Sequence, residues 1–380
     1  MSPRVRRRPS EELLGVVVPV YNVEDFLPAC LDSLLGQHHR NLDVVIVDDG
    51  SPDRSGEIAE RYAARDRRLR VVHTENHGLG AARNEGLRHV RGDLLAFLDS
   101  DDVLPPDAYT LLRDTLRETG SDFVTGSFLR WENGEYHEPR WMRRLHKDRR
   151  AGITAEEHPE ILGDVFAWDK MFRRSFWDRA DLRWPEATRY EDQPTATAAY
   201  LRGTFDVIPD HVCHWRIHGY VTAATKHRAS VVNMRDRFQT KRMSLDLVRA
   251  EGSPVIEQMF LERVLPGDMW RHFNVIPEAS EEWWGLLVAG VRDLWGSHSL
   301  VHSGLPPVHR LVGWLVEQDR RADAEAVVRY IAERGGGPLP QVQSPQGPRI
   351  DVPVLDVGTV DPGALTLRDF EVRAPVGRGE

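Results

Sequence analysis

The sequence predicts an α/β protein in which helices cover both faces of a mainly parallel sheet. Over the first 130 residues, short runs rich in Val, Ile and Leu alternate with helical patterns. These runs are almost continuously apolar, which is typical of parallel strands that are buried on both faces. Polar residues follow the first four runs, and ligands of such sheets bind beyond the carboxyl ends of the strands. Together the three observations predict one cleft along a sheet edge.

The expected elements follow one another in a regular order. Strands are expected at 13–20, 42–47, 69–72, 93–98 and 122–128. Helices are expected between them, at 23–35, 54–64, 79–89 and 106–119. In the last helix Pro106 suits the first turn and Gly120 suits the exit.

Composition divides the chain into five parts. We expect a flexible basic tail, an α/β domain, a helical accessory region, a linker rich in Gly, Pro and Gln, and a β segment, at 1–11, 12–225, 226–334, 335–348 and 349–380 respectively. Short strands are expected in the last part, at 350–357 and 366–372, as the start of a further accessory domain. The helical region is a candidate for homo-oligomerisation or for docking of an acceptor.

Charge and composition exclude several classes of protein. The net charge of −9 argues against a nucleic-acid partner, which normally meets a basic face. No run of 18 uncharged apolar residues is present, so no transmembrane segment is expected. Cys30 and Cys213 are too few for a disulfide framework, and a cytoplasmic location is expected. Arginines at positions 4–8 predict a solvated tail, with peripheral contact to anionic lipid at the inner membrane face as the alternative.

A carboxylate cluster follows the fourth expected strand, at Asp99, Asp101 and Asp102. Their mutual repulsion in a half-buried cleft would raise their pKa values, and a divalent cation would remove that cost. Mg²⁺ and Mn²⁺ prefer oxygen ligands, and Mg²⁺ often takes one or two carboxylates together with phosphate oxygens. The alternative is a surface turn that caps the next helix. The parallel-sheet context favours a metal–phosphate site.

Four motifs resemble, in order, those of family 2 glycosyltransferases. They are Val-Val-Pro-Val-Tyr-Asn, Val-Ile-Val-Asp-Asp-Gly-Ser, Asn-His-Gly-Leu-Gly-Ala-Ala-Arg-Asn and Phe-Leu-Asp-Ser-Asp-Asp, at 17–22, 45–51, 76–84 and 97–102. The resemblance covers roughly residues 13–225. It implies the GT-A fold and inverting transfer of a sugar from a nucleotide sugar, expected to be a uridine diphosphate sugar, to an acceptor hydroxyl.

The resemblance also implies roles for individual residues. Asp99 and Asp101 would face the pyrophosphate and a Mn²⁺ or Mg²⁺ ion. Contacts to the nucleotide are assigned to Pro19, Tyr21, Asn22, Asp48, Asp49, Asn76, Arg83 and Ser100. Whether Asp48 or Asp49 contacts the base of the nucleotide stays open. The stretch from Asp48 to Ser51 also fits a tight turn followed by a capped helix. An arginine suits a diphosphate because its guanidinium offers a planar fork of donors.

Inversion at a sugar carbon needs a base that takes the proton of the attacking hydroxyl. The resemblance assigns this role to Asp192, with Glu191 holding the acceptor or neighbouring groups. Without the resemblance, both residues would be interpreted as caps of a helix over 195–200. Arg216 and His218 are predicted to contact the pyrophosphate or metal, with a structural role for the histidine as the alternative.

The segment 166–172 is similar to one on the acceptor side of bacterial polysaccharide and teichoic-acid glycosyltransferases. Lys170 would there meet an anionic acceptor or the diphosphate, or else form a surface ion pair. The resemblance implies an acceptor among surface polysaccharides, wall polymers or polyol phosphates. The Gln-x-x-Arg-Trp signature of processive synthases is absent, which favours a distributive enzyme.

Two other functions compete with this interpretation. A nucleotidyltransferase also combines a parallel sheet with metal and nucleotide, but it usually has a glycine-rich loop bearing Lys or Arg after the first strand. Pro19 to Asn22 offers neither. A degenerate module that binds a glycan or a partner would lack carboxylates at one strand end, and all are present.

Overall fold

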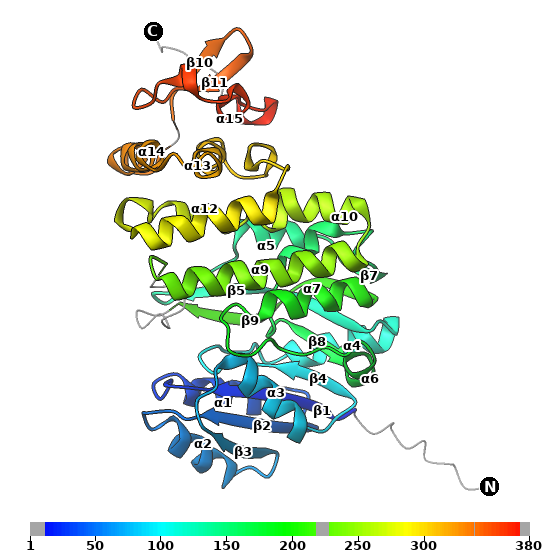
Figure 1. The fold of residues 1–380 in the computed structure, drawn as a ribbon. Coiled ribbons are helices and arrows are strands. Elements are labelled where there is room, and N and C mark those ends of the chain that lie inside the picture. Colours follow the sequence, from blue (N-terminus) through cyan, green and yellow to red (C-terminus); the bar gives the residue numbers. More distant parts are fainter. Residues whose placement is uncertain (1–11, 218–227, 338, 373–380) are drawn as a thin grey trace, which may run out of the picture. The chain divides into compact units, whose positions relative to one another are not determined.

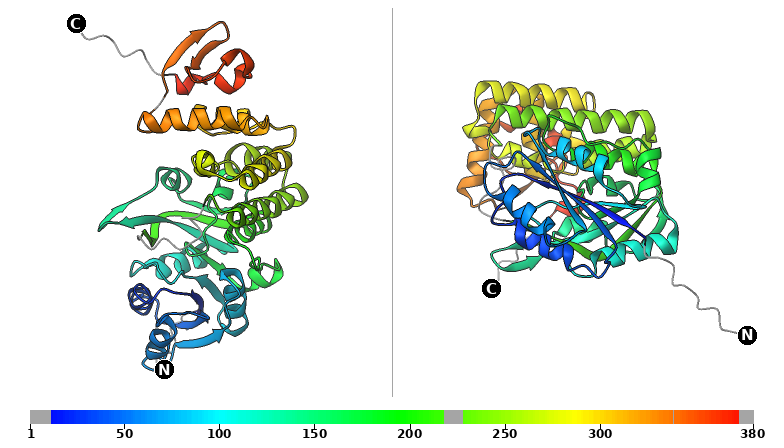
Figure 2. Two further views of the ribbon diagram at one scale, coloured as in Figure 1. Left: turned by 60° about the vertical axis from the view of Figure 1, so that its left-hand side comes forward. Right: turned by 90° about the horizontal axis from the view of Figure 1, so that it is seen from below.

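The computed structural model describes residues 12–217, 228–337 and 339–372. The chain divides into two compact units, Met1–Val221 with Ala250–Gly252, and Thr222–Arg249 with Ser253–Glu380. Figures 1 and 2 show the strands and helices of both units. The helical region and the C-terminal β segment thus belong to one unit, whereas the composition suggested separate parts.

A large sheet forms the centre of the first unit, with the strand order β3-β2-β1-β4-β8-β5-β9-β7. Its first four strands run parallel and comprise β3 (Leu69–Thr74), β2 (Leu42–Asp49), β1 (Leu14–Val20) and β4 (Leu94–Phe97). The others are β8 (Lys170–Arg173), β5 (Phe123–Glu132), β9 (Phe205–Ile217), β7 (Arg150–Ile153) and β6 (Glu135–His137), which pairs with β5. The predicted mainly parallel sheet with flanking helices is confirmed.

One strand of the sheet, β8, was not predicted from the sequence. The fifth strand, β5, does not lie beside β4, because β8 is inserted between them and runs antiparallel to both. β8 is only 4 residues long and lies in an aromatic-rich stretch without a clear strand pattern. Apolar runs indicate which segments are strands, but they do not specify the order of those strands in the sheet.

The helices expected at 23–35, 54–64, 79–89 and 106–119 are present, although the first begins four residues later than predicted, and those at 140–145 and 174–179 were not predicted. The helices of the first unit are α1 (Leu27–Leu35), α2 (Ser55–Ala63), α3 (Leu79–His89), α4 (Ala108–Thr119), α5 (Arg140–Leu145), α6 (Arg174–Arg179) and α7 (Asp192–Arg202), with a 3₁₀ turn at Pro159–Gly163. α4 begins at Ala108 rather than at Pro106, and Asp107 occupies its N-cap position without a side-chain capping hydrogen bond. Gly120 ends this helix in the left-handed conformation (φ +78°), as its sequence position predicted.

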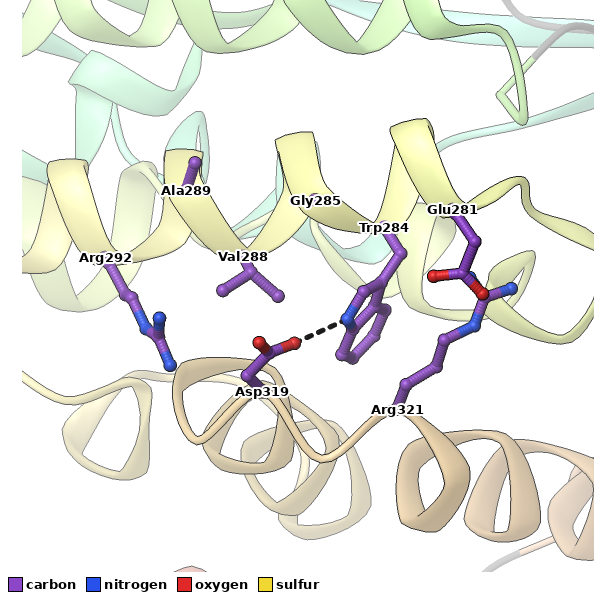
Figure 3. A pocket seen from close by; sticks show the side chains of 8 residues that line it. All are labelled: Glu281, Trp284, Gly285, Val288, Ala289, Arg292, Asp319 and Arg321. Atoms are coloured by element: carbon purple, nitrogen blue, oxygen red, sulfur yellow. Dashed lines mark hydrogen bonds and ion pairs between the residues drawn. The ribbon is translucent and has the colours of Figure 1, made fainter.

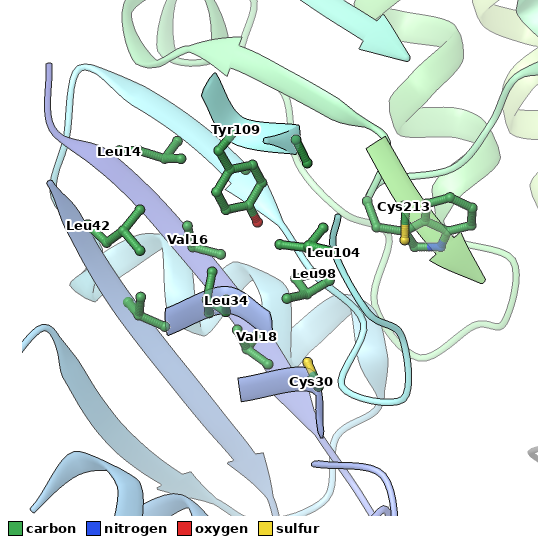
Figure 4. Close-up of a cluster of buried hydrophobic side chains, with 14 of the residues drawn as sticks. Leu14, Val16, Val18, Cys30, Leu34, Leu42, Leu98, Leu104, Tyr109 and Cys213 are labelled. Atoms are coloured by element: carbon green, nitrogen blue, oxygen red, sulfur yellow. The ribbon is translucent and has the colours of Figure 1, made fainter. Parts of the chain in front are cut away.

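Alternate residues of β1 are buried on opposite faces of the sheet. Val16 and Val18 belong to the apolar cluster that includes Leu34 of α1 and Tyr109 of α4 (Figure 4). Val17 faces α3 on the other side, where a Cβ atom at Gly86 would lie 2.3 Å from its Cγ1 atom. Both faces of the strand are therefore covered, which explains why its sequence is continuously apolar.

Lys170 lies in the interior of the first unit, with 1% of its surface exposed. Its Nζ atom donates to the carbonyl of Phe166 and to Asp169 Oδ1, each at 2.8 Å, and lies 3.1 Å from Asp164 Oδ1. Both interpretations of this lysine, as a contact to an anionic ligand and as a surface ion pair, are therefore wrong. The sequence could not show that its two acidic partners are buried with it.

Lys170→Met is expected to destabilise the fold by about 3–5 kcal/mol, because it leaves buried carboxylates without their cation. Chemical denaturation measures this loss. Lys147→Met is the matched control, since Lys147 is exposed, and it should stay within about 0.5 kcal/mol of the parent. Equal stability of both variants would show that the buried ion pairs contribute little.

The second unit is mostly helical. Its helices are α9 (Val231–Glu251, whose last two residues count with the first unit), α10 (Pro254–Met259), α11 (Trp270–Phe273), α12 (Glu281–Trp295), α13 (Pro307–Glu317), α14 (Arg321–Glu333) and α15 (Pro362–Leu365). A π-helical turn follows α10 at Phe260–Val264, and 3₁₀ turns lie at Ile276–Glu278, Leu300–His302, Val357–Thr359 and Asp369–Glu371. Within the described ranges, no helix is both long and apolar enough to span a bilayer.

The C-terminal part differs from its prediction. The expected linker at 335–348 contains β10 (Gln341–Ser344) and the first half of β11 (Gly347–Ile350), which pair as an antiparallel hairpin. The strands expected at 350–357 and 366–372 are instead mainly turns and short helices. Gly347, at φ +105°, allows the tight reversal. Because this hairpin is polar and only partly buried, its composition resembles that of a linker.

Candidate active site

The carboxyl ends of β1, β2 and β4 meet at one edge of the parallel sheet. The register places Val20 opposite Asp48 and Val17 opposite Phe97. The polar residues that follow these strands therefore lie along the same edge, as predicted. Tyr21 is 48% exposed there, and Asn22 has a left-handed backbone at φ +55°.

The two adjacent aspartates at the end of β2 hold the neighbouring loops. Asp49 accepts hydrogen bonds from the backbone N–H groups of His77 (2.9 Å) and Gly78 (2.8 Å) and from the hydroxyl of Thr74 (3.2 Å). Asp48 accepts from the Ser51 N–H at 3.1 Å. Both carboxylates thus organise turns, as one of the two interpretations expected, and their contact with a nucleotide base stays a prediction.

A pocket of about 500 Å³ adjoins Asp48 between the end of β2 and α2. His73 lies on its wall, and the two ring nitrogens of His73 lie 2.9 Å from Asp48 Oδ2 and 3.0 Å from Glu60 Oε1. These two carboxylates raise the pKa of the histidine, Glu60 having the larger effect. Asp53 and Glu57 also line the pocket, so its negative charge disfavours the phosphates of a donor.

Two of the predicted nucleotide contacts differ in exposure. Asn76 is exposed after β3, so its side chain is accessible to a ligand. Pro19 is buried within β1, so only its backbone could reach the edge. Gly50, at φ +68°, brings the two loops together, because a Cβ atom there would lie 2.9 Å from the Asn76 nitrogen.

Arg83 on α3 is completely buried and joins three carboxylates. One guanidinium nitrogen donates to Asp99 Oδ1 at 2.7 Å. The other donates to Glu191 Oε1 at 2.8 Å and also to Asp192. The structure therefore brings the predicted base, Asp192, and one of the two predicted metal ligands, Asp99, to one cation. The predicted contact of this arginine with the nucleotide remains untested.

Close packing of α3 against the segment before α7 brings these groups together. A Cβ atom at Gly80 would lie 2.0 Å from the carbonyl oxygen of Pro185, so only glycine allows this approach. Asn84 donates to the carbonyl of Trp184 at 2.8 Å and accepts from its N–H at 3.1 Å. The Trp184 ring lies 4.7 Å from the guanidinium carbon of Arg83.

Asn84 and Trp184 were not among the predicted site residues. A signal existed for Asn84, because it directly follows Arg83 in the third motif. Trp184 lies 100 residues further along the chain, and no local pattern connects the two positions.

The segment before α7 carries backbone strain. Ala187 and Tyr190 have φ values of +55° and +64°, which are costly for residues other than glycine. Glu191 occupies the N-cap of α7, but its side chain makes no capping hydrogen bond. The interpretation of Glu191 and Asp192 as simple helix caps therefore lacks its defining contact, since both side chains reach Arg83 instead.

Burial raises the pKa values of two carboxyls in this cluster. The pKa of Asp99 is raised to about 6, chiefly by desolvation, although Arg83 opposes this effect. The pKa of Glu191 is raised to about 8 by desolvation and by the neighbouring Asp192. One buried guanidinium does not balance this group of acids, so an added cation would lower their electrostatic energy.

The remaining residues after β4 point in different directions. Asp102 is buried and accepts the backbone N–H of Arg216 at 2.7 Å, so it fixes β9 beside the edge. Ser100 is also buried, and Asp101 is partly exposed. The Arg216 guanidinium lies 5.0 Å from the Trp131 ring. His218 lies outside the described residues.

The carboxylates at this edge form an incomplete set of ligands for a divalent cation. Within 12–217, 228–337 and 339–372, no group of three or more His, Cys, Asp or Glu residues forms a ready-made metal site. Asp99 and Asp101 alone fit an ion that completes its shell with phosphate oxygens and water. The residues present therefore fit a metal that binds together with the donor, and they do not fit a cage made by the protein alone.

Comparison with known proteins agrees with this geometry. Residues 15–179 match the family model described as glycosyl transferase family 2. The uncharacterized glycosyltransferase EpsJ of Bacillus subtilis is 36% identical over 198 residues, which cover 50% of this chain. The match spans only 56% of the length of EpsJ.

Two solved structures share the fold. Residues 1–349 of Staphylococcus aureus TarS, in complex with UDP-GlcNAc, give a TM-score of 0.69 at 20% identity and cover 89% of this chain and 96% of that one. The mannosyltransferase PcManGT of Pyrobaculum calidifontis, in complex with GDP-Man and Mn²⁺, gives a TM-score of 0.51 at 20% identity. This match covers 86% of this chain and 87% of that one. At such identities the likeness shows the fold alone.

Proposed function

Since residues 15–179 belong to glycosyl transferase family 2, we propose that the chain moves a sugar from a nucleotide-sugar donor to an acceptor hydroxyl. The observation that supports this most is the carboxylate cluster around Arg83. It places Asp99, an acid suited to a metal–diphosphate, beside Asp192, an acid suited to proton transfer, at the sheet edge where ligands bind.

The proposed reaction inverts the configuration of the transferred sugar. Asp192 accepts the proton of the acceptor hydroxyl while the oxygen attacks the anomeric carbon. The bond from that carbon to the diphosphate breaks, and the diphosphate leaves with its negative charge. Mn²⁺ or Mg²⁺, held by Asp99 and Asp101, supplies charge neutralisation for this leaving group when bound.

Arg83 and Glu191 position the base in this proposal. The guanidinium fixes the Asp192 carboxylate by a direct hydrogen bond, and α7 fixes its backbone. Glu191 shares the same guanidinium nitrogen, so it restricts the orientation of Arg83. Tyr21 and Asn76, which are exposed at the sheet edge, are left to contact the nucleotide.

The donor and acceptor are proposed as classes. A uridine diphosphate sugar is the proposed donor, supported by the same fold in TarS with UDP-GlcNAc. A surface polysaccharide, wall polymer or polyol phosphate is the proposed acceptor. The proposed location is the cytoplasm, with the inner face of the membrane as the alternative, and the second unit is proposed to serve acceptor docking or self-association.

Nucleotide binding is expected to depend on the metal. Calorimetry should show that UDP binds at least about tenfold more tightly with Mn²⁺ than with a chelator, because Asp99 and Asp101 would hold the ion and its charge would offset that of the diphosphate. Asp101→Asn should remove most of that difference. Asp107→Asn, an exposed change beyond the cluster, is the control and should retain it. Metal-independent binding in the parent chain would contradict the proposed metal site.

A further inference from the structure

A second pocket, of about 510 Å³, is lined only by residues of the second unit (Figure 3). One wall is α12, and the other is the turn between α13 and α14. Its volume lies in the range of small-molecule sites. The proposed transfer reaction uses none of its residues.

The part of α12 that lines the pocket between Gly285 and Ala289 is apolar, and we call it the floor. It contains Gly285, a glycine that close packing does not require. Val288 and Ala289 lie next to Gly285 along α12. Glycine is a poor residue for a helix interior. A Cβ atom at Gly285 would meet nothing within 4 Å, so a larger residue would fit the helix. What the glycine provides is open space above the floor.

Polar groups are fixed on both walls, Asp319 on the turn after α13 and Arg292 on α12. Asp319 lies just beyond α13 with φ +56°, a position that usually takes glycine or asparagine. Its Oδ1 atom accepts the Trp284 indole N–H at 2.7 Å, as Figure 3 shows, which holds the carboxylate over the floor. Arg292 donates through Nε to the Glu317 carbonyl at 2.8 Å, and its other nitrogens have no hydrogen bond to the described part of the chain.

The charges in the pocket balance. The lining carries two arginines and two acids, and Arg321 pairs with Glu281 at 2.9 Å, so its charge is compensated. Arg292 and Asp319 leave no excess of either sign. A phosphate or carboxylate ligand therefore gains little here. A neutral ligand with hydroxyl groups and an apolar face matches the fixed donors, the fixed acceptor and the apolar floor.

We propose that this pocket binds a neutral sugar unit of a glycan. Hydroxyl groups of the sugar bond to Asp319 Oδ2 and to the Arg292 guanidinium, and the C–H face of the ring lies on the floor beside Gly285. Binding as such is independent of the transfer reaction. That the bound glycan is the acceptor rests on the proposed function.

The test is calorimetry of the full chain with three neutral probes, the β-linked tetrasaccharides of glucose, galactose and N-acetylglucosamine. At least one is expected to bind. Gly285→Leu should abolish this binding by filling the pocket, and its melting temperature should not fall, because leucine suits a helix better than glycine. Glu282→Leu, on the same helix outside the pocket, is the matched control and should bind normally.

Asp319→Asn should weaken the same binding about tenfold, because a hydrogen bond to a charged acceptor is lost. The proposal is overturned if no neutral probe binds, if binding survives Gly285→Leu, or if only inorganic phosphate or an oligogalacturonate binds. Donor hydrolysis without acceptor should be unchanged in Gly285→Leu. Donor hydrolysis tests the proposed glycosyl transfer, whereas calorimetry tests sugar binding in the second pocket. If glycosyl transfer failed, the binding result would still hold.

Discussion

Asp192→Asn is expected to lower turnover by about 10²–10⁴-fold, the usual contribution of a positioned base. An amide keeps the size of the side chain and can still accept a hydrogen bond from Arg83, but it cannot take the proton of the acceptor. Donor consumption should be measured with the uridine diphosphate sugar that a hydrolysis screen identifies. Binding of UDP and Mn²⁺ should remain within about twofold of the parent.

The control for this variant is Asp178→Asn. Asp178 is exposed on α6 and pairs with Arg174, and its loss should leave turnover unchanged. Turnover that survives Asp192→Asn would remove this residue from the role of base. Loss of both turnover and UDP binding would instead indicate a role in holding the donor.

Arg83→Met is expected to destabilise the first unit by about 3–5 kcal/mol, because three carboxylates lose a buried cation. The loss should depend on pH. Glu191 has its pKa raised to about 8, so the folded state binds more protons than the unfolded one and becomes less stable as pH rises toward 8. Arg83 lowers the pKa values of Asp99 and Glu191, so its removal raises them further. The stability of the variant should therefore fall more strongly with rising pH than that of the parent. Denaturation at pH 5.5 and 8.5 should therefore show the smaller loss at the lower pH.

Arg88→Met provides the comparison for Arg83→Met. Arg88 lies on the same helix, but its side chain is 71% exposed, and among the described residues its ion pair is with Glu85. Its loss should cost less than about 1 kcal/mol at either pH. A loss for Arg83→Met that is small or independent of pH would contradict the electrostatic account of the cluster.

Local sequence patterns predicted most of the parallel half of the sheet. α3 has the predicted bounds, and β1 to β4 lie within two residues of theirs, because periodicity and turn residues act over short distances. The carboxyl ends of these strands also placed Asp48 and Asp99 at one edge. Each of these features is determined by residues that lie close together in the sequence.

What the sequence did not predict depends on distant partners. The inserted strand β8 is defined by its pairing with β4 and β5, not by its own pattern. The contacts of Arg83 with Glu191 and Asp192 join residues more than 100 positions apart. Lys170 has the residue type of a surface group, and only tertiary burial makes it part of the interior. Such features need the packed structure.

The insertion of β8 affects the order in which the chain can assemble. β4 lies at the edge of a four-stranded sheet until residues 170–173 arrive, about 70 residues later in synthesis. During that interval its unpaired N–H and C=O groups are open to strands of other molecules. Long-range pairing of this kind slows folding and exposes intermediates to aggregation. Truncations that end before β8 should therefore aggregate, although they contain Asp99 and Asp101.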